Sequence, residues 1–332
     1  FGRPVAARSM VRVARSTSSP ISNGRSAMLP RVLRLLPILL ALAATCGACS
    51  EPSSQGPRAE AAPGGVLPGS SAAADWVSVL LEPGDVSALP EQVATWSVVR
   101  KDPDRWGSLP RFPQFTSEAV LGLRPRLVFV SPWTDAAVVR RVREAGVGVV
   151  DVPEPSTWPD LVATGRRVAE AVDRTARFDA FLEELEARRS ALAARAAARG
   201  LVRVLPYSNG GAGGWTMGAD TTVDLALELA GCVNVAAERG VLGPAPFADE
   251  ELLGSAFDWI VVGGEDGVSP SAEILRGKRH LRESVAALRA DRIVVLSEAQ
   301  YSSGSFTILD AAEAIADAIE ARAEGTGGTA GR

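Results

Sequence analysis

A long helical stretch in the middle of the chain limits the fold most strongly. No proline or glycine interrupts residues 175–199, and Phe178, Leu185 and Leu192 give them an apolar face. As one helix this stretch would be roughly 37 Å long, and Gly200 supplies a natural stop. Apolar residues already recur at helical spacing from Trp158 onward, so we expect residues 158–200 to form a connecting helical segment.

Short apolar runs alternate with helical patterns on both sides of that segment. Before it we predict four strands and two helices, at Trp76–Leu81, Trp96–Val99, Leu127–Val130, Val147–Val152, Ser117–Leu123 and Asp135–Ala145. After it we predict three strands and three helices, at Leu201–Tyr207, Asp258–Val262, Arg292–Leu296, Thr222–Leu229, Leu281–Leu288 and Ile308–Ala321. The run Leu-Val-Phe-Val at 127–130 has no polar alternation, which is typical of parallel sheets buried between helices. The pattern predicts two Rossmann-like α/β lobes, at 75–157 and 201–323, joined by one long α-helix.

Charge is distributed unevenly along the chain. The 332 residues contain 35 basic and 39 acidic side chains, but residues 1–49 hold seven arginines and no acid. The remainder therefore carries a net charge of about -11, which repels phosphate backbones and argues against nucleic-acid binding.

The segment 28–49 has the features of an export signal. Arg31 and Arg34 precede a short apolar stretch, and small residues follow it. Two cysteines end the segment, as in bacterial lipoproteins, and Cys49, with small residues before it, is the better lipidation candidate than Cys46. The alternative is an ordinary signal peptide whose cysteines are incidental. We expect the protein to act outside the cytoplasm, in the periplasm or an equivalent extracytoplasmic space, anchored to the membrane by lipid.

Two further stretches are poor in structure-forming residues. Residues 50–74 are rich in Ser, Pro, Gly and Ala, which predicts a disordered linker, and the Gly-rich residues 324–332 predict a flexible tail. Cys232 is the one cysteine in the predicted folded region, so no internal disulfide is expected there.

Four stretches resemble the periplasmic substrate-binding proteins of ABC importers for vitamin B12, haem and ferric siderophores. They begin at Phe115, Met217, Phe247 and Val285, and the second contains Ala-Gly-Cys-Val-Asn. In that family one rigid helix joins two lobes and the ligand lies between them. The chain departs from the family at Arg126, where Asp is usual, and at Cys232, where Gly is usual. Pro90 also disrupts residues 82–95, which have the length of the family's first helix.

The resemblance implies partners and contact residues. Glu118 and Glu250 match the glutamates that dock on permease arginines, and Glu251 could replace Glu250 in that role. The alternative is that these are solvated acids, which the helix dipole favours near helix starts. Loop aromatic residues at strand ends would bind a large flat ligand, with Arg111 beside them to favour an anionic chelate. The candidate ligand contacts are Phe115, Trp133, Trp158, Trp215, Phe247, Tyr301 and Arg111; Trp76, Trp96 and Trp259 are expected in the core.

The remaining motifs indicate no catalytic or metal chemistry. His280 is the one histidine and lies in a charged stretch, which argues against a zinc or manganese site and against His-dependent catalysis. Tyr207 or Tyr301 could ligate haem iron, although buried hydrogen-bonded tyrosines are commoner. The glycine-rich loop 208–215 lacks the ending of a P-loop.

We therefore predict a monomeric, non-enzymatic substrate-binding lipoprotein without a resident cofactor or metal. It would capture a cobalamin, a ferric siderophore or haem and deliver it to an ABC permease and its ATPase. Two alternatives stay open: a lipid-anchored α/β hydrolase, and a degenerate binding fold used for surface interaction or sensing.

Overall fold

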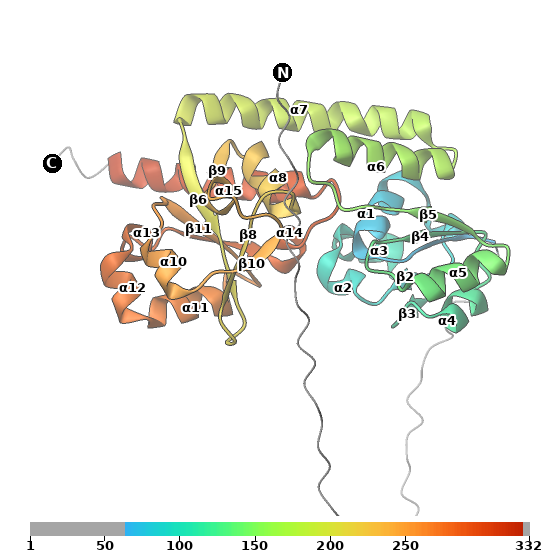
Figure 1. Ribbon diagram of the computed structural model, residues 1–332. Helices are drawn as coiled ribbons and strands as arrows, with labels where there is room; N and C mark the ends of the chain where they lie inside the picture. The colour runs from blue at the N-terminus through green and yellow to red at the C-terminus, as the bar shows by residue number, and fades with distance from the viewer. Residues whose placement is uncertain (1–63, 328–332) are drawn as a thin grey trace, which may run out of the picture. The chain divides into compact units, whose positions relative to one another are not determined.

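The computed structural model describes residues 64–327, which all lie within one compact unit of the chain. Two α/β lobes and a long connecting helix make up this part (Figure 1). The predicted fold class is therefore confirmed. The signal segment and Cys49 lie outside the described residues.

The N-terminal lobe is built on a parallel sheet of β1 (Val66–Pro68), β4 (Leu127–Val130) and β5 (Gly148–Asp151), in the order β1-β4-β5. β2 (Leu89–Pro90) and β3 (Arg111–Phe112) form a short parallel pair. The helical elements of this lobe are α1 (Ser71–Leu80), η1 (Pro83–Asp85), α2 (Val93–Trp96), η2 (Val98–Lys101), α3 (Pro103–Trp106), α4 (Ser117–Gly122), α5 (Ala136–Glu144) and α6 (Trp158–Ala171).

The C-terminal lobe contains a four-stranded parallel sheet in the order β12-β11-β6-β9 and an antiparallel sheet in the order β10-β8-β7. Its strands are β6 (Val202–Pro206), β7 (Ser208–Asn209), β8 (Gly214–Met217), β9 (Cys232–Asn234), β10 (Pro244–Pro246), β11 (Trp259–Gly264) and β12 (Ile293–Ser297). Its helices are α8 (Thr222–Leu229), α9 (Val235–Glu238), α10 (Asp249–Leu253), α11 (Pro270–Gly277), α12 (Arg279–Ser284), α13 (Ala286–Arg289), α14 (Glu298–Tyr301) and α15 (Ile308–Gly327).

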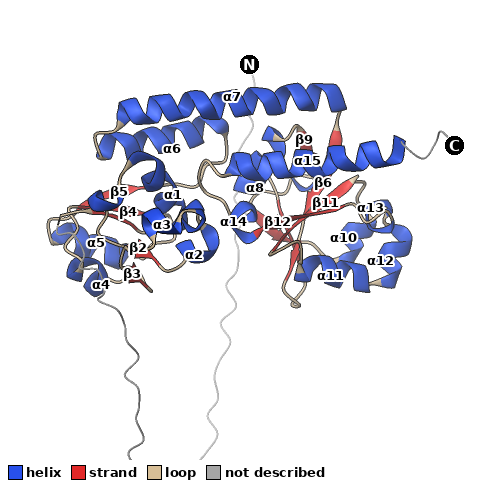
Figure 2. Cartoon of the chain, turned by 180° about the vertical axis from the view of Figure 1, so that it is seen from behind, coloured by secondary structure: helices blue, strands red, loops and turns tan. Residues whose placement is uncertain are grey.

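The connecting helix α7 (Thr175–Arg199) has the predicted bounds and is unbroken. It packs against α6 and α1 on the N-terminal side and against α15 and α8 on the C-terminal side, and Figures 1 and 2 show it running along both lobes. The Arg188 guanidinium bonds Asp310 at 2.6 Å and Glu313 at 2.7 Å, which fixes α7 on α15. A turn at Asp173, with a φ of 56°, separates α7 from α6, so residues 158–200 form two helices.

Three predictions for the start of the folded part are wrong. Residues 66–74, placed in the disordered linker, form β1 and the first turns of α1. The predicted strand Trp76–Leu81 lies within α1. That helix is buried on almost every side, so its apolar run lacks the one-sided spacing that distinguishes a helix from a buried strand. Since the first strand–helix unit is 66–80, Pro90 does not disrupt it and instead lies in β2.

Other predicted boundaries also change. The predicted strand Trp96–Val99 is the end of α2 and the start of η2, where the Ser97 side chain caps the turn by accepting from Val99 N. The predicted helix Leu281–Leu288 is divided between α12 and α13, because Val285 has an extended backbone. The predicted tail 324–332 begins too early, since α15 runs to Gly327.

Candidate ligand-binding pocket

A pocket of about 410 Å³ lies at the carboxyl ends of the N-terminal strands and reaches the C-terminal lobe. The segments after β1, β4 and β5 supply most of its wall, as expected for a parallel sheet. The segment after α14 adds Ser302 and Gly304 from the other lobe. The lining residues are Gly69, Ser70, Ser71, Ala72, Gln92, Trp96, Phe115, Ser131, Trp133, Thr134, Asp135, Val152, Pro153, Glu154, Ser302 and Gly304.

Three aromatic side chains give the pocket its apolar surface. Trp133 is 80% exposed and Trp96 is 44% exposed, whereas Phe115 is half-buried. The Phe115 ring lies against the turn at Gly69, where a Cβ would approach Phe115 Cε2 to 2.8 Å and the Phe129 carbonyl oxygen to 2.5 Å. A glycine at 69 therefore lets this ring pack against the main chain between β1 and α1.

Polar groups in the pocket are short hydroxyls, the Gln92 carboxamide and two carboxylates. Asp135 caps α5 by accepting from the backbone of Ala137 at 2.6 Å. Trp133 Nε1 donates to Glu154 Oε1 at 2.7 Å, which holds the exposed indole at the rim. Ser71 Oγ is buried and has no hydrogen-bond partner among the described residues. No Lys, Arg or His occurs among the lining residues.

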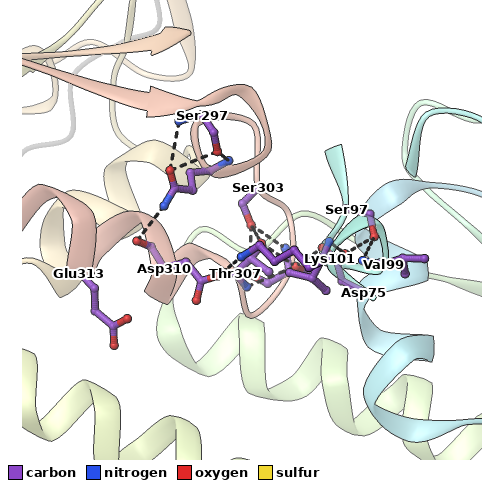
Figure 3. A network of polar contacts seen from close by, with 12 residues as sticks. Asp75, Ser97, Val99, Lys101, Ser297, Ser303, Thr307, Asp310 and Glu313 are labelled. Atoms are coloured by element: carbon purple, nitrogen blue, oxygen red, sulfur yellow. Dashed lines mark hydrogen bonds and ion pairs between the residues drawn. The ribbon is translucent and has the colours of Figure 1, made fainter. Parts of the chain in front are cut away.

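A buried polar contact connects the lobes beside this pocket (Figure 3). Asp75 on α1 accepts from Ser97 Oγ at 2.5 Å and Val98 N at 3.0 Å, and its second oxygen accepts from Ser305 Oγ at 2.6 Å. Ser305 belongs to the segment between α14 and α15. Burial raises the pKa of Asp75 to about 6, against the lowering effect of these donors, and the nearby Asp310 adds to the rise.

The pocket contains two of the predicted ligand contacts, Phe115 and Trp133. Trp158, Phe247 and Tyr301 are buried and do not line it. Trp158 begins α6, where its Nε1 donates to Glu186 at 2.7 Å, and Phe247 packs in the core of the C-terminal lobe. Tyr301 donates its hydroxyl to the Tyr207 carbonyl oxygen at 3.3 Å, and burial raises the pKa of this hydroxyl.

The other two predicted contacts also lie outside the pocket. Trp215, on β8, is 44% exposed. Arg111 donates to the Trp106 carbonyl oxygen at 3.3 Å, and burial lowers the pKa of its guanidinium. Arg105 pairs with Glu82 at 2.9 Å, so neither arginine brings positive charge to the pocket.

Several pocket residues were not predicted. Trp96 was expected in the core, but it ends α2 one helical turn after Gln92, and both line the pocket. Gln92 and Trp96 are four residues apart, a spacing that places two side chains on the same face of a helix. This spacing, directly after Pro90, could have predicted that the two side chains lie together. No sequence signal indicated Glu154 or Gly304, because both lie in irregular segments that only the tertiary fold brings together. A Cβ on Gly304 would lie 3.6 Å from Glu154 Cγ.

The two predicted docking residues are exposed, one on each lobe. Glu118 lies in the first turn of α4, and Glu250 in the first turn of α10. Hydrogen bonds from the Glu118 backbone N–H and the Ser117 hydroxyl lower the pKa of the Glu118 carboxyl. His280 lies next to α10, with its Nε2 3.2 Å from Asp249 Oδ2. Among the described residues, no group of three or more His, Cys, Asp or Glu side chains is placed to hold a metal.

Comparison with known proteins decides the family. Residues 72–299 match the periplasmic binding protein family, and this match covers more than half of the chain. The chain belongs to this family. The resemblance found in the sequence is thus confirmed, and membership in a family of binding proteins supports the predicted binding function over the hydrolase alternative.

The curated proteins that resemble this periplasmic binding protein bear the name cobalamin-binding protein. A cobalamin-binding protein of Halobacterium salinarum is 28% identical over 192 residues, which are 58% of this chain and 49% of that protein. The chain thus spans about half the length of the curated relatives it matches.

Solved structures show the same fold. The haem-binding protein RhuT of Roseiflexus sp. RS-1 has a TM-score of 0.65 and 21% identity, over 77% of this chain and 99% of that one. The vitamin B12-binding protein BtuF of Vibrio cholerae has a TM-score of 0.61 and 16% identity, over 79% and 97%. Helices long and apolar enough to cross a bilayer do not occur among residues 64–327.

Proposed function

We propose that this protein is the substrate-binding lipoprotein of an ABC importer, anchored outside the cytoplasm through Cys49. It would capture a large metal chelate, such as a cobalamin, a ferric siderophore or haem, between its lobes and deliver it to a permease and ATPase. The supporting observation is a pocket with three aromatic side chains, Trp96, Phe115 and Trp133, to which both lobes contribute.

The arrangement of these rings suits a wide, flat ligand. A ligand that covers an exposed aromatic side chain removes its apolar surface from water, which favours binding. The flat faces of such rings also pack well on macrocycles. The three rings come from different segments of the N-terminal lobe, whereas Ser302 and Gly304 belong to the other lobe. A ligand on the rings would therefore meet the C-terminal lobe at the same time, which is the geometry of capture between two lobes.

Tryptophan fluorescence of the full chain tests this proposal. Titration with cyanocobalamin, hemin or a ferric siderophore should give a saturable change for at least one probe. Trp96→Ala or Trp133→Ala should then weaken binding about tenfold or more, because each removes part of the aromatic surface. Trp215→Ala is the matched control: Trp215 is 44% exposed, as Trp96 is, but lies outside the pocket. Equal losses in all three variants, or no binding by any probe, would contradict the proposal.

Docking through Glu118 and Glu250 can be separated from ligand capture. Both residues are exposed and outside the pocket, so Glu118→Ala with Glu250→Ala should leave the Kd for the ligand unchanged. Stimulation of the importer's ATPase activity should fall several-fold, since the double variant removes the docking carboxylate from each lobe. Glu170→Ala, at an exposed position on α6, serves as the control. Full stimulation by the double variant would contradict docking through these residues.

A further inference from the structure

The charges around the pocket point to a narrower class of ligand. Every charged side chain that lines the pocket is a carboxylate: Asp135 and Glu154. Asp135 is engaged with the start of α5, whereas Glu154 uses only Oε1, to accept from Trp133 Nε1. Glu154 forms no ion pair with a described residue.

The two cations on the segment that follows Trp96 form ion pairs with carboxylates that do not line the pocket. Arg100 and Lys101 follow Trp96 and line a neighbouring cavity of about 220 Å³, which Trp96 also borders. Arg100 pairs with Glu265 at 3.1 Å and Lys101 with Asp310 at 3.6 Å. A ligand carboxylate placed on the rings of Trp96 and Trp133 would therefore meet Glu154, and no positively charged side chain lines the pocket to compensate.

We infer that the pocket takes a chelate whose buried face is uncharged or cationic and carries hydrogen-bond donors, such as carboxamides, and that it disfavours chelates with peripheral carboxylates. Glu154 sets this preference: one oxygen orients the Trp133 ring, and the other accepts from no described residue and is open to a donor from the ligand. A donor from the ligand offsets the loss of water around that carboxylate, whereas an anionic group adds repulsion and leaves the carboxylate unpaired. This inference rests on the proposed function.

Isothermal titration of the full chain with two probes at low ionic strength tests the inference. Cyanocobalamin has a carboxamide periphery, and hemin has peripheral carboxylates. The wild-type protein should bind cyanocobalamin at least about tenfold more tightly than hemin. Glu154→Lys should strengthen hemin binding about tenfold and weaken cyanocobalamin binding, since the cation pairs with carboxylates.

Two further variants keep the outcome interpretable. Glu154→Gln keeps an acceptor for Trp133 Nε1 without the charge but turns a donor toward the ligand, so it should weaken cyanocobalamin binding less than Glu154→Lys does and should reduce the discrimination against hemin. Glu170→Lys makes the same change in net charge at an exposed site away from the pocket and should alter neither affinity. Hemin binding as tight as that of cyanocobalamin in the wild type, or equal responses of Glu154→Lys and Glu170→Lys, would overturn the inference alone. Failure of both probes and of a ferric siderophore to bind would overturn the proposed function, and the inference with it.

Discussion

Replacing Trp76 by Ala is expected to lower the free energy of unfolding by about 3–5 kcal/mol, the range for deleting a large buried aromatic side chain. Trp76 on α1 has no exposed surface. Its ring centroid lies 6.1 Å from that of Phe178 on α7 and 5.2 Å from that of Phe306, which precedes α15. The ring therefore joins the N-terminal lobe, the connecting helix and the C-terminal lobe. Urea unfolding of the full chain measures the change.

Trp76→Phe is the matched variant for this prediction. It keeps an aromatic ring between Phe178 and Phe306 and removes an indole N–H that finds no acceptor among the described residues. We expect it to cost clearly less than Trp76→Ala, because part of the packing stays and no buried donor is left unpaired. A loss below about 1 kcal/mol for Trp76→Ala would show that the lobes are not joined through this ring.

Replacing Asp75 by Ala is expected to lower the free energy of unfolding by about 2–4 kcal/mol, because it leaves buried donors without an acceptor. Ser97 Oγ and Val98 N lose their bond within the N-terminal lobe, and Ser305 Oγ loses its bond from the C-terminal lobe. Asp104→Ala, at an exposed position on α3, should have little effect. Equal stability of the Asp75→Ala and wild-type proteins at pH 7 would contradict the structural role of this contact.

Asp75→Asn should change how stability depends on pH. Burial raises the pKa of Asp75 to about 6 in the folded protein, above the value of about 3.9 in an unfolded chain. Between these values the folded state holds more protons, so its stability falls as pH rises from about 4 to about 6, by roughly 3 kcal/mol from this residue. Asn cannot ionise, so the variant does not show this loss of stability with rising pH. The stability of Asp75→Asn relative to the wild type should therefore rise over this interval, and parallel pH profiles would refute the assignment.

The middle and end of the fold could be predicted from the sequence because their signals are local. Thr175–Arg199 contains no helix breaker and ends at Gly200, whose φ of 83° suits glycine. The four residues of β4 are apolar and buried on both faces. The start of the fold could not be predicted, since β1 is short and lies among small residues, and α1 is buried too completely to show an amphipathic spacing.

The pocket could be predicted only in part, for a related reason. Phe115 and Trp133 follow recognisable elements, so their place near strand ends could be inferred. Exposure of an aromatic side chain, however, depends on the tertiary fold: Trp158 and Phe247 are covered by neighbouring elements, whereas Trp96, expected in the core, faces the pocket. Glu154 and Gly304 meet only because the two lobes pack at Asp75 and Ser305.

Fluorine NMR of the full chain with all tryptophans replaced by fluorotryptophan tests the central claim most directly. Seven tryptophans give separate probes of pocket, core and surface. On addition of cyanocobalamin, the signals of Trp96 and Trp133 should shift strongly, while those of Trp76, Trp158 and Trp215 should stay near their starting positions. Saturable binding that shifts Trp158 or Trp215 and leaves Trp96 and Trp133 unchanged would place the ligand elsewhere and contradict capture in this pocket.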